Sequence, residues 1–457
     1  MHLLLIALLS TSARAEPSLS ALDDGLRVYV EPRPGSKSVA IALAVGVGSA
    51  NETPENNGAA HFLEHYLFTG TARWTETELQ DAVERRGGSW NGQTTLHKTV
   101  YHVHLPAEEL RFGLEWIEQV VFQPRFDDKL FERERNVVFQ ERGGRKGLAS
   151  NTLERLGFGL DVARARRGLL FPGTGMALSV GGQDASLDAM TLGSLRAFYE
   201  RYYVAPNASL LVVGGVSTDE VLAALPEVFA DARASAAPPP LPDLPPLSPA
   251  RQAVVRGPWD NDEQTLSIGA RAVGVTSPDF WALRLLTQVL DKALTRELRQ
   301  GRGMVYSVGA TLSAYGQTGE LSVTTTARGQ HTAEIRAIVN GALDDAVAGP
   351  IDPEAVADAA AYLRGLYALS QEDNFNRAWW CADFVMQGAL PPDISASLAA
   401  VTPAQLTDVA RRYLAPELRR EALHDPILTA WSGAALAVAL VSGGALLMRW
   451  RARSRRV

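Results

Sequence analysis

Cysteine is nearly absent from this chain. Its 457 residues include one, Cys381, so no internal disulfide can form and the hydrophobic core has to stabilise the fold. Cys381 follows Trp379 and Trp380 and precedes Ala382. This apolar setting predicts a buried packing residue rather than a nucleophile.

Basic residues are fewer than acidic residues in this chain. Lys and Arg number 44 against 51 Asp and Glu, which gives a formal net charge of −7. Six of the basic residues lie near the chain ends, at Arg14 and within residues 449–457. The segment between them keeps 38 basic against 51 acidic residues, a net charge near −13. This balance argues against nucleic acid as a partner and favours basic or neutral substrates.

The N-terminus has no Lys or Arg ahead of its apolar run. Residues 3–9 are apolar, and the small-x-small pattern Ala13-Arg14-Ala15 follows them. The pattern predicts a secretory signal peptide over residues 1–15. If it is not cleaved, the same apolar run would be a second, short anchor.

Charge is missing altogether from residues 427–448, a run of 22 residues near the C-terminus. At about 1.5 Å per residue, a helix of this length spans a bilayer core. Trp431 and Trp450 bracket the run, and an arginine-rich tail follows it. A buried core helix is the alternative, although such helices seldom reach this length uncharged beside an Arg cluster.

These two ends together predict a location. Residues 426–448 are expected to form a transmembrane helix and residues 449–457 a cytoplasmic basic tail. The protein would then be anchored in a bacterial inner membrane, with the segment between its two ends on the periplasmic side.

Prolines gather in one internal stretch, residues 236–250, which predicts a semi-extended linker. The linker separates an N-terminal α+β domain (16–235) from a C-terminal α+β domain (251–425). Two segments recur across it: residues 201–206 resemble 411–416, and residues 100–103 resemble 305–308. The expected fold class is therefore α+β, with two duplicated α/β sandwich halves and one C-terminal transmembrane helix.

Local periodicity locates further elements. Residues 99–105 alternate as a strand with His102 and His104 facing outward, and a solvated strand face accounts for this histidine pair without a metal ion. Asp127 is expected to cap a helix that runs to about Arg142. A long helix is expected from Pro278 to Arg299.

The most specific motif is His61-Phe62-Leu63-Glu64-His65. Positions four apart share one helix face, so both imidazoles can reach one metal ion, and Glu64 lies close to the same face. This is the inverted zinc-hydrolase pattern H-x-x-E-H. Glu134 and Glu141 lie seven residues, or two turns, apart on the helix expected after Asp127, so their carboxylates project from one face.

These residues resemble the pitrilysin or insulinase family of zinc metallopeptidases, and within it the processing-peptidase-like subfamily. The resemblance covers most of residues 20–420. It rests on residues 58–71, Gly87-Gly88 with Asn91, residues 134–141, residues 201–207 and residues 298–308. It implies that His61, His65 and Glu141 bind one Zn²⁺ per chain, that Glu64 is the general base, and that Glu134 supports the site.

The resemblance also implies how substrate binds. Arg299 and Tyr306 match a pair that grips the substrate and its tetrahedral intermediate, and Asn91 and Gly92 match the strand along which a peptide adds. In that family the active site faces a chamber formed by two chains or halves, so Arg299 and Tyr306 would reach an active site across it.

The chain also departs from the family pattern. The family usually has alanine where Gly92 stands, and Arg142-Gly143-Gly144-Arg145 replaces a hydrophobic continuation, which predicts an abrupt end to the ligand helix. A C-terminal membrane anchor is not typical of the family either.

Three functions follow as expectations. The first is a membrane-anchored extracytoplasmic zinc metalloendopeptidase acting on peptides or unfolded segments, as a homodimer. The second is a non-catalytic peptide-binding or structural subunit. The third is the catalytic half of a heterodimer with a related chain. The complete set of ligands and base favours an enzyme.

Overall fold

The computed structural model describes residues 16–145, 161–230, 235–256 and 263–425. The expected signal peptide (1–15), transmembrane helix (426–448) and basic tail (449–457) lie outside these residues. Within the described ranges, no helix is both long and apolar enough to cross a membrane.

A six-stranded sheet organises the first half, in the spatial order β1-β2-β6-β3-β5-β4. Strands β2 and β6 pair in parallel, and the other neighbours pair antiparallel. The strands are β1 (Ser18–Ala21), β2 (Arg27–Pro32), β3 (Ser38–Val45), β4 (Ser89–Thr94), β5 (Thr99–Pro106) and β6 (Ala208–Gly214). The helices of this half are α1 (Ala59–Leu67), α2 (Glu76–Glu84), α3 (Leu110–Phe122), α4 (Asp128–Glu141), α6 (Val162–Leu170), α7 (Asp184–Ala189), α8 (Leu192–Tyr202) and α9 (Thr218–Val228).

A five-stranded sheet organises the second half, in the order β7-β11-β8-β10-β9. Its strands are β7 (Gln252–Val255), β8 (Glu263–Val273), β9 (Val305–Tyr315), β10 (Thr318–Arg328) and β11 (Arg420–His424). Its helices are α10 (Phe280–Leu294), the π-helix η5 (Thr295–Gly301), α11 (Thr332–Ala348), α12 (Pro353–Ser370), α13 (Asn374–Val385), α14 (Ile394–Ala399) and α15 (Pro403–Tyr413). The mixed α/β class that the sequence predicts is confirmed.

The two sheets share one topology. Taken in chain order, β2 to β6 correspond to β7 to β11, and both sets lie side by side in the same order with the same directions. The predicted repeat of residues 201–206 and 411–416 agrees with this match, because both segments leave helices, α8 and α15, that precede the last strand of their half. The predicted repeat of residues 100–103 and 305–308 does not. It joins β5 to β9, whereas the counterpart of β5 is β10.

Each half covers the other half's sheet with one helix. Helix α13 packs its buried Cys381 and Ala382 on Tyr29, Ala42 and Val213 of the first sheet. Helix α6 reciprocally packs against β7, β8 and β11, with Val162 against Val255 and Ala422. Cys381 is buried, as the sequence predicts, and burial raises the pKa of its thiol to about 12.

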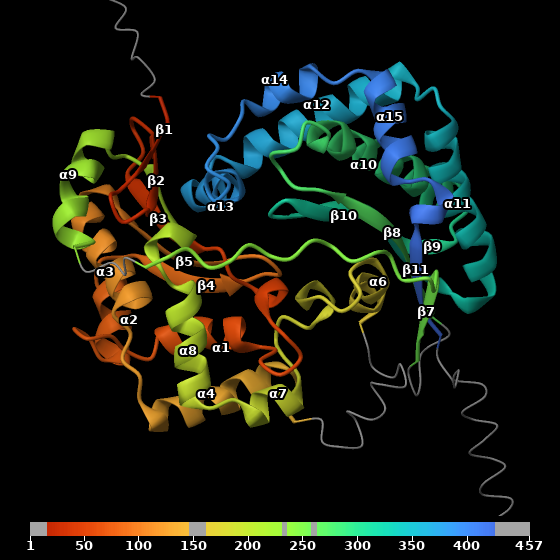
Figure 1. Ribbon diagram of the computed structural model, residues 1–457. Coiled ribbons are helices and arrows are strands. Elements are labelled where there is room, and N and C mark those ends of the chain that lie inside the picture. The colour runs from red at the N-terminus through yellow and green to blue at the C-terminus, as the bar shows by residue number, and fades with distance from the viewer. Residues whose placement is uncertain (1–15, 146–160, 231–234, 257–262, 426–457) are drawn as a thin grey trace, which may run out of the picture.

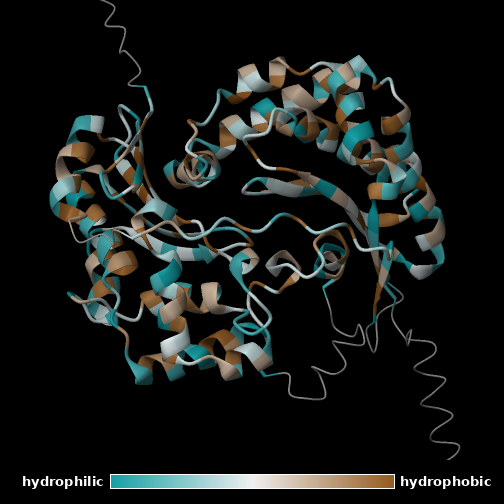
Figure 2. Cartoon of the chain, in the orientation of Figure 1, coloured by the Kyte–Doolittle hydropathy of each residue, from teal (hydrophilic) through white to brown (hydrophobic). Residues whose placement is uncertain are grey.

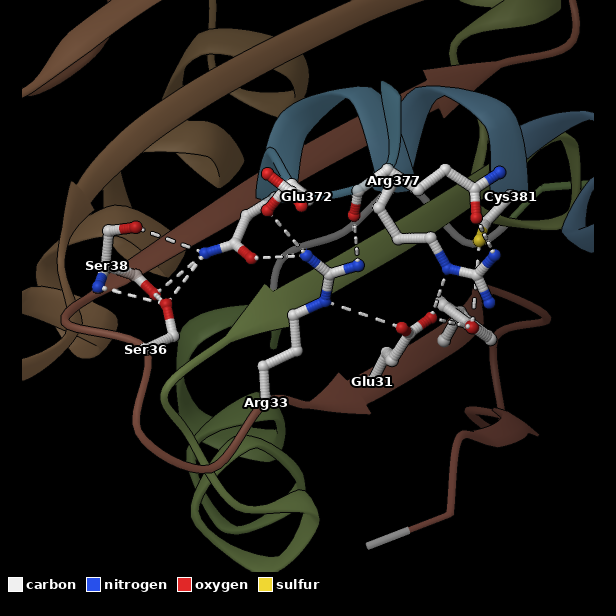
Figure 3. A network of polar contacts seen from close by, with 10 residues as sticks. Glu31, Arg33, Ser36, Ser38, Glu372, Arg377 and Cys381 are labelled. Atoms are coloured by element: carbon white, nitrogen blue, oxygen red, sulfur yellow. Dashed lines mark hydrogen bonds and ion pairs between the residues drawn. The ribbon is translucent and has the colours of Figure 1, made fainter. Parts of the chain in front are cut away.

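Polar contacts hold α13 in place (Figure 3). Arg33 donates to the backbone oxygens of Gln371 and Glu372 at 2.7 and 3.0 Å, and Arg377 forms a 2.7 Å ion pair with Glu31. Figure 2 shows the matching hydropathy pattern, in which helices of both halves alternate hydrophobic and hydrophilic residues around their axes.

The covering by α13 corrects one expectation. The outward face of β5 is not a solvated surface, because the His102 ring stacks on Phe375 of α13 with centroids 3.7 Å apart. His104 Nε2 lies 2.9 Å from Ser38 Oγ. The alternating pattern located the face correctly, but a helix about 270 residues further along the chain covers it.

A second correction concerns the helix expected from Pro278 to Arg299. Helix α10 ends at Leu294 and continues as the π-helix η5, in which Arg302 N donates to Glu297 O across five residues. The wider turn lies just before Gly301 and Gly303, where regular helical bonding stops. Arg299 therefore lies on a widened turn rather than on a regular helix.

The proline-rich segment forms neither helix nor strand over residues 235–251 and crosses from the first half to the second (Figure 1). Arg271 and Arg420 of the second half donate to the backbone oxygens of Pro245 and Ser248, at 2.7 and 2.8 Å. These contacts attach the end of the segment to the second sheet.

Candidate metal centre

Helix α1 carries the histidine motif, and its start is fixed by the loop before it. Gly58 has φ of 96°, and a β-carbon there would lie 2.7 Å from Gly182 Cα, so the turn requires glycine. The buried carboxylate of Glu52 accepts the N–H groups of Gly58 and Ala60, both at 2.8 Å. An acidic group thus satisfies two backbone N–H groups at the start of α1 that have no partner within the helix, which fixes the helix that presents both histidines.

Helix α4 brings Glu141 beside α1. Asp127 caps it as predicted, accepting from the backbone N–H of Lys129 and Leu130. The expected abrupt end is confirmed, since Glu141 is the last helical residue and Gly144 N closes the turn on Phe139 O at 2.8 Å.

The histidines and Glu141 converge on one point. His61 Nε2 and His65 Nε2 lie 3.6 and 3.1 Å from the same carboxylate oxygen of Glu141. Among the described residues, these three form the one group of such donors found within 4.8 Å of each other. A tetrahedral zinc ion with its usual bond lengths keeps donor atoms roughly 3.3–3.6 Å apart, and the two distances to Glu141 are close to this range. Two imidazoles and a carboxylate are also ligand types that zinc takes.

The charge states of these groups also suit a metal site. Burial, together with the charge of His65, lowers the pKa of His61 to about 4, so its imidazole is neutral at neutral pH. Burial raises the pKa of Glu64, and a hydrogen bond from Thr94 partly opposes that shift. A carboxyl group with a raised pKa beside the neutral imidazole of His61 is suited to accept a proton.

A cavity of about 400 Å³ opens over these residues. Seven of the predicted site residues line it: His61, Glu64, His65, Asn91, Gly92, Glu134 and Glu141. The buried Glu134 accepts a 2.8 Å hydrogen bond from Arg133. A larger cavity of about 560 Å³ lies beneath the proline-rich segment and includes none of the predicted site residues.

Arg299 and Tyr306 do not join this cavity. Arg299 is exposed on η5, and Tyr306 is 88% exposed on β9, the edge strand of the second sheet. The structure thus brings the predicted metal and base residues together in the first half and leaves the Arg/Tyr pair on the surface of the second.

Two residues that position the side chains of the site are not among the predicted site residues. Thr94 Oγ1 donates to Glu64 Oε2 at 2.8 Å, and Glu52 caps α1. The alternation of strand residues could have found Thr94, because it shares a strand face with Gly92. No local pattern marks Glu52, which reaches α1 through a loop.

His61 and His65 of α1 converge on one point with Glu141, and Glu64 lies on the same helix as the two histidines. This arrangement defines a zinc-peptidase type of site. A sequence model of the insulinase family (peptidase family M16) matches residues 27–154, and a model of the peptidase M16 inactive domain matches residues 189–363. The chain belongs to peptidase family M16.

Known proteins resemble this chain over between about half and nine tenths of its length. An uncharacterized zinc protease of Mycobacterium leprae is 29% identical over 78% of this chain and 79% of its own. A probable mitochondrial-processing peptidase subunit beta of Arabidopsis thaliana is 26% identical over 47% of this chain and 39% of its own. The crystal structure of a protease from Helicobacter pylori shares the fold, with a TM-score of 0.79 at 21% identity, over 90% of this chain and 100% of that one.

Proposed function

We propose that this chain is a zinc-dependent metalloendopeptidase that hydrolyses peptides or unfolded segments. The observation that carries the proposal is the convergence of His61, His65 and Glu141 in one cavity with Glu64. Family membership and relatives named as zinc proteases support it.

The metal donors, Glu64 and Glu134 have different roles in the proposed peptide hydrolysis. His61, His65 and Glu141 would hold one zinc ion per chain, and that ion would supply the Lewis acidity that lowers the pKa of a water molecule to near 7. Glu64 accepts the proton of that water and later returns it to the leaving amine. Glu134 lies two helical turns before Glu141 on α4, and its bond to Arg133 keeps its charge paired beside the site.

Substrate binding is assigned to the exposed edge of the first sheet. Strand β4 is the last strand of that sheet and carries Asn91 and Gly92 at the cavity. A peptide that adds to β4 as a further strand would bring its backbone to the metal donors.

The Arg/Tyr pair is assigned to a second active site. Arg299 and Tyr306 are exposed and lie outside the cavity of their own chain, which supports a role across a chamber shared with a partner subunit. Because this chain holds both the metal donors and the pair, a homodimer suffices. A heterodimer with a related chain is the alternative, and the Arabidopsis relative is itself named as a subunit.

We place the peptidase outside the cytoplasm, tethered to a bacterial inner membrane by residues 426–448. The support is the composition of the two chain ends. A chain ending at Asp425 should leave the membrane fraction and keep its peptidase activity. A truncated chain that stays with the membrane, or that is soluble and inactive, would contradict the anchor as the sole role of those residues.

A non-catalytic subunit is the competing function. The model of the inactive domain matches this chain, but over residues 189–363, which begin after the last metal donor. All three donors and the base lie within residues 27–154, and this arrangement favours an enzyme.

One comparison tests the proposal. The full-length protein and its Glu64→Gln variant are purified in detergent, analysed for bound zinc and incubated with a peptide library. We expect both to hold zinc and only the unaltered protein to cleave. Equal cleavage by the two proteins would exclude Glu64 as the base, and zinc-loaded protein that cleaves no peptide would favour the non-catalytic subunit.

A further inference from the structure

Strand β4 touches the Glu64 side chain at two of its residues. Thr94 Oγ1 donates to Glu64 Oε2 at 2.8 Å, and a β-carbon on Gly92 would lie 2.7 Å from Glu64 Cγ. We propose that Thr94 and Gly92 are positioning residues that hold the Glu64 carboxylate in its working orientation. This inference rests on the proposed function and adds the residues that align its base.

The Thr94 hydroxyl is itself held by the sheet. Thr99 is its register partner on β5, and the two Oγ1 atoms lie 3.3 Å apart. Thr99 Oγ1 donates to Val47 O at 2.9 Å, which leaves the Thr94 proton for Glu64. A charge-assisted hydrogen bond from a fixed donor sets both the place and the rotation of a carboxylate.

The bond also distinguishes the two carboxylate oxygens of Glu64. Thr94 engages Oε2, whereas Oε1 is the oxygen nearer Gly92, 3.1 Å from the position of its missing β-carbon.

Gly92 contributes through the space that its missing side chain leaves. Its φ is not in the left-handed region, so the backbone does not require glycine here. A β-carbon would meet Glu64 Cγ on one side and Phe68 Cε2, at 2.9 Å, on the other. Phe68 cannot give way easily, because its ring packs against Trp90 and Trp116. A methyl group at residue 92 would therefore displace Glu64.

The same strand is the edge on which we place the peptide substrate. Strand β4 thus holds the base on one side and offers its free edge to the scissile peptide on the other. Loss of the Thr94 hydrogen bond, or a methyl group added at residue 92, should misalign the Glu64 carboxylate and the scissile peptide by a fraction of an ångström. Because such errors act on the chemical step, the expected defect is in kcat rather than in KM.

Four variants of the full-length protein test the proposal. Thr94→Val keeps the shape and removes the hydroxyl, Thr94→Ser restores the hydroxyl, and Gly92→Ala adds the methyl group. Thr265→Val is the matched control, since Thr265 pairs its hydroxyl with Thr326 at 3.0 Å in the second sheet. Zinc content, kcat and KM are measured for each on one cleavable peptide.

We expect Thr94→Val and Gly92→Ala to hold zinc and to lose about 10- to 100-fold in kcat with KM within twofold. Thr94→Ser should recover most of the loss, and Thr265→Val should match the unaltered protein. Unchanged kcat in Thr94→Val, or a Thr94→Ser as slow as Thr94→Val, would overturn the proposal while leaving the proposed function intact.

A crystal structure of Thr94→Val keeps the test independent of activity. The Glu64 carboxylate should leave the position it holds in the unaltered protein. A carboxylate in the same place overturns the proposal whatever the kinetics. By contrast, a zinc-loaded unaltered protein without activity counts against the proposed function.

Discussion

The two halves of the molecule share a sheet topology but carry different chemistry at the same place. Between its second and third common strands, the first half inserts α1, whose motif faces the cavity, and the second half inserts α10 and η5, which end at the exposed Arg299. The edge strands β4 and β9 are counterparts as well. Strand β4 buries Gly92 against Glu64, whereas β9 presents Tyr306 to solvent.

This difference shows what a duplicated fold permits. Both halves need the same buried strands and covering helices, so those parts constrain each copy equally. The connection between the second and third strands leads to the edge strand and differs between the copies, with α1 and α2 in the first half and α10 and η5 in the second. One copy can therefore hold a metal while the other offers groups that bind substrate.

The largest effects should separate these two roles. Glu141→Gln removes a metal donor, so we expect zinc to be lost together with about 100-fold or more of the activity. Arg299→Ala should keep zinc and lose about 100-fold, because it removes a cation that we assign to the developing oxyanion. Metal analysis beside peptide hydrolysis distinguishes them. Zinc loss in Arg299→Ala would break the division between the halves.

Buried ion pairs hold α6 and α13, the exchanged helices, each of which covers the sheet of the other half. Lys98 meets Asp383 of α13 at 2.7 Å, and Glu320 meets Arg166 of α6 at 3.0 Å. Lys98, Arg166 and Glu320 are almost fully buried. Asp383→Ala and Glu320→Ala each leave a buried cation unpaired, so each should lower the free energy of unfolding by about 3–5 kcal/mol.

Urea unfolding measures that loss, and an exposed pair gives the control. Asp81→Ala removes the partner of Arg85, whose side chain is 77% exposed, and should cost less than about 1 kcal/mol. If Asp383→Ala or Glu320→Ala costs no more than Asp81→Ala, the buried pairs do not hold the exchanged helices.

We expect low pH to destabilise the packing of α13 on the first sheet. Burial, helped by the charge of His104, lowers the pKa of His102 to about 4, whereas an unfolded histidine titrates near 6.5. Between these values the unfolded chain binds more protons, so the stability falls as the pH drops from 6.5 to 4. The contribution is roughly 3 kcal/mol.

Urea unfolding between pH 4 and pH 7 tests this effect, with His102→Gln as the comparison. The substitution should flatten the pH dependence by that amount. An equal slope in both proteins would assign the acid sensitivity to other groups.

The smallest effects should be equal across the halves. Thr191 and Thr402 cap the equivalent helices α8 and α15, each accepting a backbone N–H three residues on. Thr191→Ala and Thr402→Ala should each cost about 1 kcal/mol, and the serine variants close to nothing. Thermal unfolding of the four variants checks this. Clearly unequal costs would show that the two helices differ in their role despite their matching topology.

The local parts of the site could be predicted from the sequence. The four-residue spacing of His61 and His65 and the seven-residue spacing of Glu134 and Glu141 are properties of single helices, and the structure places all four at one cavity. The cap at Asp127 and the end at Glu141 are local as well. The family resemblance supplied what periodicity does not, namely that Glu141 approaches the histidines.

The parts that could not be predicted depend on contacts between distant residues. The ion pair of Glu31 with Arg377 joins residues 346 positions apart, so no window of sequence indicates that α13 covers the first sheet. The prediction that His102 lies on a solvated strand face was wrong for this reason. The repeat of residues 100–103 failed because four letters of strand sequence recur without shared ancestry.

The exchange of α6 and α13 bears on how such a chain arises. A separate copy of either half would leave one sheet face bare, yet two copies that traded this helix would satisfy each other. The proline-rich segment joins the two halves, so it covalently connects partners that would otherwise form a domain-swapped pair. Cutting that join should leave two fragments that remain bound, and neither should fold without the other.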